Sequence, residues 1–301
     1  MAESVGEARA NATAAAGPCA GMLPPRGFAA VGAAGFEPVG RARGTGSYHV
    51  EVSGETWNWH AHDCGYSSRP TGPAPVVVSG SGGSSTVLVE VLEGARHRAL
   101  ERLRGACAQL GGHGVVGAQV GIAPSTVTWL GADVTVSGTV VRARGVADAV
   151  ALPFVTHLDG ADFAKLLLAG WVPVDLLVGQ CVGVRHEDRT SWNQQRSAAN
   201  EEMHGWTELL GRVREGARAR LHEQAAERGG DGALLNGDEV AVWEQRCQRP
   251  GTASAGRREP TDKVARCTVV GTSVARFASG PAGPAGPAGV RPLTVLPLRG
   301  A

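Results

Sequence analysis

Apolar residues recur every three or four positions in two stretches of the chain, and this spacing predicts two amphipathic helices. The stripe in the first half consists of Val87, Val91, Ala95, Ala99, Leu103 and Ala106. The stripe in the second half consists of Trp206, Leu210, Val213, Ala217, Leu221 and Ala225. Gly111-Gly112 and Gly229-Gly230 follow the stripes and predict where the helices end. Asn200 is the expected N-cap of the second helix, because it precedes Glu201 and Glu202, which suit a helix N-terminus.

Segments that flank both predicted helices predict β-strands, most clearly Val174–Val184, which is rich in β-branched residues and bounded by glycines. In the first half they are Val39–Val52, a weaker version of that segment, Val115–Ile122 and Asp133–Arg142. In the second half they are Val174–Val184, Ala233–Val242 and Ala265–Phe277. Each half therefore reads β-α-β-β, and the expected fold class is α+β.

Three segments recur in the same order in the two halves, which indicates an internal duplication. Residues 34–39 align with 169–174 at 4 of 6 positions, 99–116 with 217–234 at 7 of 18, and 136–141 with 269–274 at 4 of 6. The offsets are 135, 118 and 133 positions, so insertions separate the anchors, as expected for loops. We expect two tandem domains, residues 26–148 and 152–278, packed closely because the linker is short.

The two ends of the chain differ in composition from these domains. Residues 1–25 are rich in Ala, Gly and Pro and hold almost no bulky apolar side chain, so we expect disorder there. Residues 279–301 contain GPAGPAGPAG from Gly280 to Gly289 and predict a stiff, polyproline-like tail. The apolar stretch Leu293–Leu298 could dock on a partner surface, with a disordered tail as the alternative.

A three-stranded unit with one helix leaves unpaired strand edges, which other chains or the second unit must cover. The economical solution is pairing between copies in a ring with cyclic symmetry. The sequence therefore predicts a homo-oligomer.

Composition excludes several classes of partner and compartment. The 301 residues carry 29 Lys and Arg against 28 Asp and Glu, so no overall field attracts nucleic acid or an anionic membrane. We find no signal peptide and no apolar run long enough to span a bilayer, which favours a cytoplasmic protein. The six cysteines lack any Cys-x-x-Cys pair, so free thiols are expected rather than a disulfide framework.

The helix that runs into Leu110–Gly117 (LGGHGVVG), followed by Val134–Val141 (VTVSGTVV), resembles the YbjQ family, also called the heavy-metal-binding domain. The second half carries a related turn, GGDGAL from Gly229 to Leu234, and a related strand, Val270–Val274. The chain resembles a tandem, actinobacterial-type member, because 27 of its basic residues are Arg and 2 are Lys. The resemblance implies dodecin-like β-α-β-β subunits that assemble into a ring, pentameric in single-domain members. It supplies no ligand set for a metal.

The clearest candidate metal ligands lie in His60-Ala61-His62-Asp63-Cys64. On an extended segment His60, His62 and Cys64 share one side, and two imidazoles with a thiolate suit Zn²⁺ or another soft divalent metal. His49 or His97 could supply a fourth ligand. The alternative is a set of ordinary loop residues, since the second half lacks this segment.

Other polar features favour structural roles. Cys181, near His186, Glu187 and Asp188, is expected to be a buried structural thiol. His113 and Asp231 occupy equivalent turns, where a polar side chain caps or bonds local backbone. Ser79–Ser85 (SGSGGSS) lacks a phosphate-loop lysine and suits a linker and N-cap. The basic residues Arg212, Arg214, Arg218 and Arg220 suit a solvated helix face, and Arg246–Arg266 suits an exposed loop.

No Ser, Cys or His falls in a nucleophile elbow or beside an evident base, so we expect no enzyme, no catalytic residues and no organic cofactor. Three functions stay open: a metal-binding homo-oligomer, a ring scaffold without metal, and small-molecule binding or hydrolysis at an interface between the domains.

Overall fold

The protein was analysed as a computed structural model, which describes residues 23–49, 76–78, 85–124, 131–146, 150–186, 189–246, 261–276 and 296–297. The first half contains α2 (Pro25–Ala33), β1 (Phe36–His49), β2 (Val76–Val78), α3 (Ser85–Gln109), β3 (Gly114–Pro124) and β4 (Gly131–Ala143). The second half contains β5 (Phe154–Val155), α4 (Gly160–Leu168), β6 (Trp171–His186), α5 (Arg189–Gln195), α6 (His204–Glu227), β7 (Gly232–Arg246), β8 (Thr261–Arg276) and β9 (Leu296–Pro297). The predicted α+β class is confirmed.

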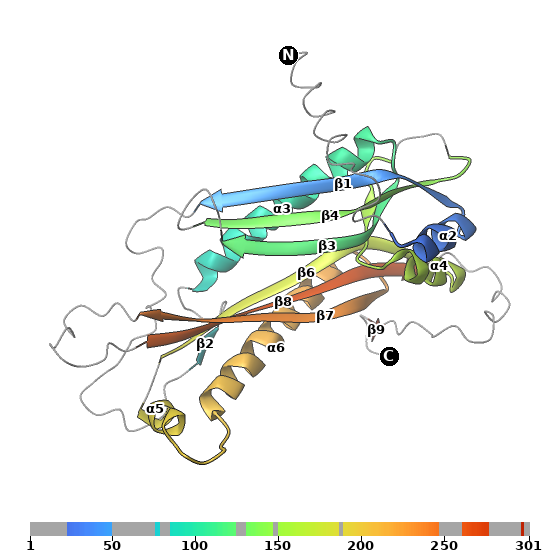
Figure 1. The fold of residues 1–301 in the computed structure, drawn as a ribbon. Coiled ribbons are helices and arrows are strands. Elements are labelled where there is room, and N and C mark those ends of the chain that lie inside the picture. Colours follow the sequence, from blue (N-terminus) through green and yellow to red (C-terminus); the bar gives the residue numbers. More distant parts are fainter. Residues whose placement is uncertain are drawn as a thin grey trace.

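The strands form two sheets, one for each half (Figure 1). The first sheet has the order β1-β4-β3-β5, and the second has the order β2-β6-β8-β7-β9. Neighbouring strands are antiparallel except for β3 and β5, which are parallel. Two short strands cross between the halves: β2 of the first half pairs with β6, and β5 of the second half pairs with β3.

The long helix α3 covers one face of the first sheet, and α6 covers one face of the second sheet (Figure 1). One side of α3 packs on β1 and β4. The helix also shares buried clusters with β6 of the second sheet, where Val89 packs with Val182 and Val184. The two halves therefore pack closely, as expected.

Both long helices approach their sheets at a glycine. A Cβ on Gly44 would lie 2.0 Å from the carbonyl oxygen of Ala99, and a Cβ on Gly179 would lie 2.0 Å from that of Ala217. The two contacts involve residues at aligned positions of the two halves. Gly44 and Gly179 are 135 positions apart, and Ala99 and Ala217 are 118 positions apart. The sheets can meet the helix backbones only because glycine has no side chain here.

Backbone irregularities also recur at aligned positions. The ladder of β1 shifts register between Pro38 and Gly40, and that of β6 shifts between Pro173 and Asp175. The turns that end α3 and α6 place Gly111 at φ 66° and Gly229 at φ 72°, in the left-handed region that favours glycine. The predicted helix ends are confirmed at these two glycines.

Two sequence predictions are wrong. Asn200 does not cap α6, because the helix begins at His204 and the amides of Trp206 and Thr207 donate to the carbonyl of Met203. The segment Arg246–Arg266 is not one exposed loop, because β8 already begins at Thr261. Lys263 there forms an ion pair with Glu244 of β7, so a polar sequence is accommodated within the ladder.

The sequence did not reveal α2 and α4, the short helices that precede β1 and β6. Asp159 caps α4, where its Oδ1 accepts hydrogen bonds from the amides of Ala161 and Asp162, both at 2.9 Å. α2 starts at Pro25, so the expected disordered segment, residues 1–25, overlaps the first turn of a helix. Residues 1–22 lie outside the described residues.

Candidate functional site

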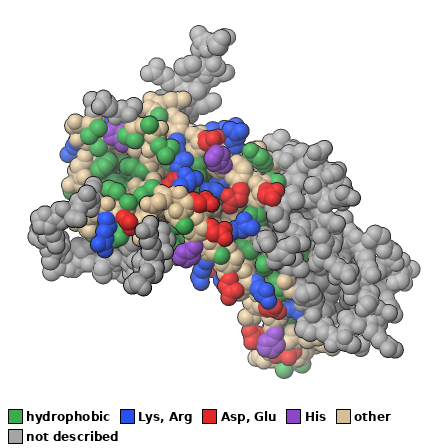
Figure 2. Space-filling model, turned by 180° about the vertical axis from the view of Figure 1, so that it is seen from behind, with side chains coloured by type: hydrophobic (Ala, Val, Ile, Leu, Met, Phe, Trp, Pro, Cys, Tyr) green, Lys and Arg blue, Asp and Glu red, His purple; other side chains and the backbone are tan. Residues whose placement is uncertain are grey.

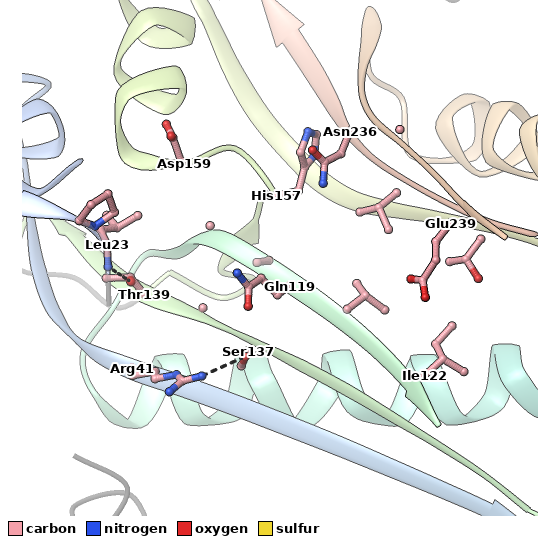
Figure 3. A pocket seen from close by; sticks show the side chains of 18 of the residues that line it. Leu23, Arg41, Gln119, Ile122, Ser137, Thr139, His157, Asp159, Asn236 and Glu239 are labelled. Atoms are coloured by element: carbon pink, nitrogen blue, oxygen red, sulfur yellow. Dashed lines mark hydrogen bonds between the residues drawn. The ribbon is translucent and has the colours of Figure 1, made fainter. Parts of the chain in front are cut away.

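A cleft of about 490 Å³ opens between the two halves (Figure 3). One wall comes from β3 and β4 of the first sheet, and the other from β7 and β8 of the second. In Figure 3 Gln119 lies near the middle of the lining, with Leu23 and Arg41 on one side and Glu239 and Ile122 on the other. His157 and Asn236 also line the cleft, which is predominantly polar and is a candidate binding site.

His157 is the most perturbed ionisable group of the cleft. Burial lowers the pKa of its imidazole to about 4, which outweighs a hydrogen bond with the Gly271 backbone and the nearby Asp162 carboxylate. Its Nδ1 lies 2.7 Å from Oγ1 of Thr272, and its amide donates to the same oxygen at 3.2 Å. His157 is therefore neutral at pH 7, and its ring is fixed by β8.

Three of the four charged side chains that line the cleft also serve the fold. Asp159 caps α4, as described above. Arg41 donates to Oγ of Ser137 at 3.4 Å, and Asp238 accepts from Nε of Arg214 at 2.9 Å. The fourth is Glu239, so the lining holds charges of both signs together with neutral polar groups, which suits binding of a small polar molecule.

The pairing of an imidazole with a hydroxyl does not make a catalytic centre here. Thr272 is fully buried, and its Oγ1 also lies 3.0 Å from Oγ1 of Thr156, so a substrate cannot reach it. Among the residues that line the described cleft, no other nucleophilic side chain has a hydrogen-bonded base. The arrangement can bind a molecule, but the described part of the chain assigns it no chemical step.

The predicted metal ligands are not tested by this structure. His60, His62 and Cys64 lie outside the described residues. Of the two suggested fourth ligands, His49 ends β1, and His97 is exposed on α3 with Nε2 3.2 Å from Glu101. Within the described ranges no three His, Cys, Asp or Glu side chains are grouped closely enough to hold a metal. The described residues therefore do not fit a metal by themselves.

The structural roles expected of the remaining candidates are confirmed where the structure describes them. Cys181 is fully buried and faces Cys267 on the neighbouring strand, and burial raises the pKa of the Cys267 thiol to about 11. His113 and Asp231 do bond backbone, but on a neighbouring strand rather than locally. Nδ1 of His113 accepts from the amide of Ala143 on β4 at 3.1 Å, and Oδ2 of Asp231 accepts from the amide of Arg276 on β8 at 3.0 Å.

The basic residues of α6 are solvated, as expected, and Arg212 pairs with Glu208 on the same helix. Figure 2 shows acidic and basic side chains intermingled over one face of the molecule, without a broad patch of one sign. Among the helices that the structure describes, none is long and apolar enough to cross a membrane. Most of Ser79–Ser85, together with Glu187 and Asp188, falls outside the described residues.

A second hollow, of about 560 Å³, lies at the junction of the short helices. Phe36, Phe154 and Phe163 meet there, with ring centroids 5.2 to 6.3 Å apart. Leu168 at its margin is 79% exposed. This hollow is apolar, unlike the cleft.

Sequence reasoning missed His157 and Asn236. Neither belongs to a motif, and His157 reaches the cleft because β5 and the segment after it lie against β3 of the other half. One signal was available in the sequence. Asp159 directly precedes an apolar stretch, as an N-cap residue does, and this position would have placed His157 just before a helix.

Comparison with known proteins supports the resemblance seen in the sequence. The sequence model of a family described as "Putative heavy-metal-binding", YbjQ, matches residues 76–144. These residues include β2, α3, β3 and β4, so the match falls on the helix, turn and strands that carried the resemblance. The resemblance is confirmed for this part of the first half.

The chain is also similar to a curated protein of Mycobacterium tuberculosis (strain ATCC 25618 / H37Rv) named "Encapsulin nanocompartment protein Rv1762c". The two are 26% identical over 213 residues, which cover 69% of this chain and 72% of the relative. No solved structure matches the chain significantly.

Proposed function

We propose that this protein is a non-enzymatic, cytoplasmic scaffold protein that assembles from copies of itself, each built from two tandem YbjQ-like modules. The recurring features support the duplication: the strand order, the register shifts, and the contacts of Gly44 with Ala99 and of Gly179 with Ala217. The name of the Mycobacterium relative, a nanocompartment protein, supports a part in an assembly.

The observation that carries this proposal is the outer edge of β7. In the described structure β9 pairs with β7 only at Gly232 and Ala233, and no other strand pairs with that edge. Two large apolar side chains of β7 are also exposed, Leu235 at 39% and Val242 at 52%. A long edge with unpaired backbone groups and exposed apolar side chains is suited to pairing with another chain.

Light scattering on the purified full chain tests this function. We expect a mass that is a multiple of 30.9 kDa at micromolar concentration and moderate salt. A mass of 30.9 kDa over the whole concentration range would overturn the proposal.

Metal binding at His60, His62 and Cys64 is a second candidate, favoured by that sequence and by the description of the matched family. Zn²⁺ or another soft divalent metal suits imidazole and thiolate ligands. Elemental analysis of untagged protein is expected to find metal that a His62→Ala, Cys64→Ser variant lacks. His222→Ala, at an exposed position on α6, is the matched control, and equal metal content in all three proteins excludes this site.

Binding of a small polar molecule in the cleft is a further candidate function. Hydrolysis of that molecule is the weaker alternative, because the described lining holds no accessible nucleophile with a base. A thermal-shift screen of small polar compounds tests this directly. Hits are expected to lose their effect in a Gln119→Ala variant, whose side chain lies near the centre of the cleft and is exposed.

A further inference from the structure

The apolar hollow at the junction of the short helices has walls from both halves of the chain. The first half contributes Ala33, Phe36 and Ala143, and the second contributes Leu152, Phe154 and Leu168, among other apolar residues. Its volume of about 560 Å³ lies within the usual range of small-molecule pockets, about 300 to 1,000 Å³. The side chain of Leu152 is 63% exposed, so apolar surface borders the hollow at its mouth. The size and the lining both suit a small apolar molecule.

The hollow exists because a small residue stands where the second half carries a large one. Ala143 of β4 aligns with Arg276 of β8, 133 positions later. In the second half the guanidinium of Arg276 covers the indole of Trp171, at 4.8 Å from the ring centroid. Phe36 is the counterpart of Trp171, and the methyl group of Ala143 is too short to cover its ring in the same way. Phe36 therefore borders the hollow.

His113 is the one polar residue among those that line the hollow in the described structure, and it is 6% exposed. Its backbone amide donates to the carbonyl of Val141 at 2.8 Å, and its carbonyl accepts from the amide of Phe154 at 3.2 Å. Its Nδ1 accepts from the amide of Ala143 at 3.1 Å. The imidazole is therefore held between β4 and β5 before any ligand binds, which lowers the entropic cost of binding.

The other ring nitrogen of His113, Nε2, has no hydrogen-bond partner among the described residues. Because Nδ1 accepts a hydrogen bond, the neutral imidazole carries its proton on Nε2, which is then a donor. Asp231 is the counterpart of His113 and accepts from a strand amide with a carboxylate oxygen alone, so that bond does not require a histidine. A largely buried donor without a partner is unfavourable, and a ligand oxygen in the hollow would satisfy it.

The charge beside the hollow favours an anionic ligand. Arg144 directly follows Ala143, and its Nη2 would lie 3.6 Å from a Cβ on Gly32 of α2. Gly32 adjoins Ala33, which lines the hollow. No acidic side chain belongs to the lining in the described part of the chain. A positive charge without an opposing carboxylate attracts an anion to this end of the molecule.

We propose that the hollow binds an amphiphile that carries an apolar chain and a terminal carboxylate, of which a medium-chain fatty acid is the simplest form. The apolar chain packs against Phe36 and Phe154, one carboxylate oxygen accepts from Nε2 of His113, and Arg144 attracts the charge. The site lies within a single copy of the chain. Self-assembly and this binding site are therefore independent of one another.

Calorimetric titration of the full chain with decanoate tests the site, and decylamine is the matched probe. The two probes have the same apolar chain, but an ammonium group offers only donors and no acceptor. We expect saturable binding of one decanoate per chain, a rise in the unfolding temperature with decanoate, and binding of decylamine at least about tenfold weaker. Failure of decanoate to bind, or equal affinity for the two probes, overturns the proposal.

His113→Asn removes the Nε2 donor and keeps a side-chain oxygen for the amide of Ala143, as Asp231 does in the second half. Its affinity for decanoate is expected to fall at least about tenfold, the usual effect of losing a hydrogen bond to a charged group. His222→Asn, at an exposed position on α6, is the matched control and is expected to bind as the natural protein does. Equal affinities of the two variants overturn the assignment of His113.

Ala143→Leu fills the hollow, and the strand is expected to accept it because Arg276 stands at the aligned position. This variant is expected to lose decanoate binding, whereas Ala226→Leu, at an exposed position on α6, keeps it. Retained binding by a folded Ala143→Leu variant places the ligand elsewhere and overturns the proposal. A changed oligomeric mass of this variant, with no decanoate binding by the natural protein, also overturns it, because another copy then covers the hollow.

Discussion

Arg104 on α3 forms an ion pair with Asp175 on β6, and this pair joins the two halves of the chain where both side chains are largely buried. Arg228, which follows α6, approaches the second oxygen of the same carboxylate at 2.9 Å. Asp175 therefore connects both long helices to one strand.

Removing this carboxylate is expected to destabilise the whole molecule. Asp175→Ala leaves Arg104 buried without its counter-charge, and the expected loss is about 3 to 5 kcal/mol of unfolding free energy. Asp162→Ala is the matched control, because the pair of Asp162 with Lys165 is partly exposed and contributes less than about 1 kcal/mol. Urea denaturation of the two variants checks this, and equal midpoints would contradict a structural role for Asp175.

The glycines under the long helices give a second prediction. Gly44→Ala and Gly179→Ala each force a methyl group against a helix carbonyl, so each is expected to cost about 2 kcal/mol or more. Gly105→Ala on α3 meets nothing within 4 Å and is expected to stabilise the helix by about 0.5 to 1 kcal/mol. Thermal unfolding measures whether each substitution lowers or raises the midpoint temperature. An unchanged midpoint for both Gly44→Ala and Gly179→Ala would show that the helices lie farther from their sheets.

His157 predicts a specific loss of stability in acid. The folded state holds its pKa at about 4, below the 6.5 of an unperturbed histidine, so the unfolded state binds the proton first as the pH falls. The contribution of neutral His157 to the free energy of unfolding is therefore fully present above pH 6.5. It is lost as the pH falls from 6.5 to 4, and the loss is about 2 kcal/mol at pH 5. We expect His157→Gln to unfold with a smaller change between pH 7 and pH 5 than the natural protein. Parallel pH profiles for both would assign the acid sensitivity to other groups.

The sequence predicted the repeated parts of the fold because those parts follow a local period. The apolar stripes that end in Ala106 and Ala225 predicted both long helices, and the glycine pairs that follow the stripes predicted where the helices end. The exposed, paired arginines of α6 and the buried Cys181 followed from the same patterns.

The remaining features depend on contacts between distant segments, which carry no local period. β5 contains two residues and exists only because it lies beside β3. The cleft joins Gln119 to Asn236 through the stacking of the two halves, and neither residue stands in a motif. Asn200 is of a residue type that favours N-cap positions, but the N-cap of α6 is Met203.

Native mass spectrometry of the full chain, sprayed from solutions of increasing protein concentration, tests self-association of two-module subunits most directly. The account predicts a species whose mass is a whole-number multiple of 30.9 kDa. A spectrum holding only the 30.9 kDa species under all conditions would contradict it.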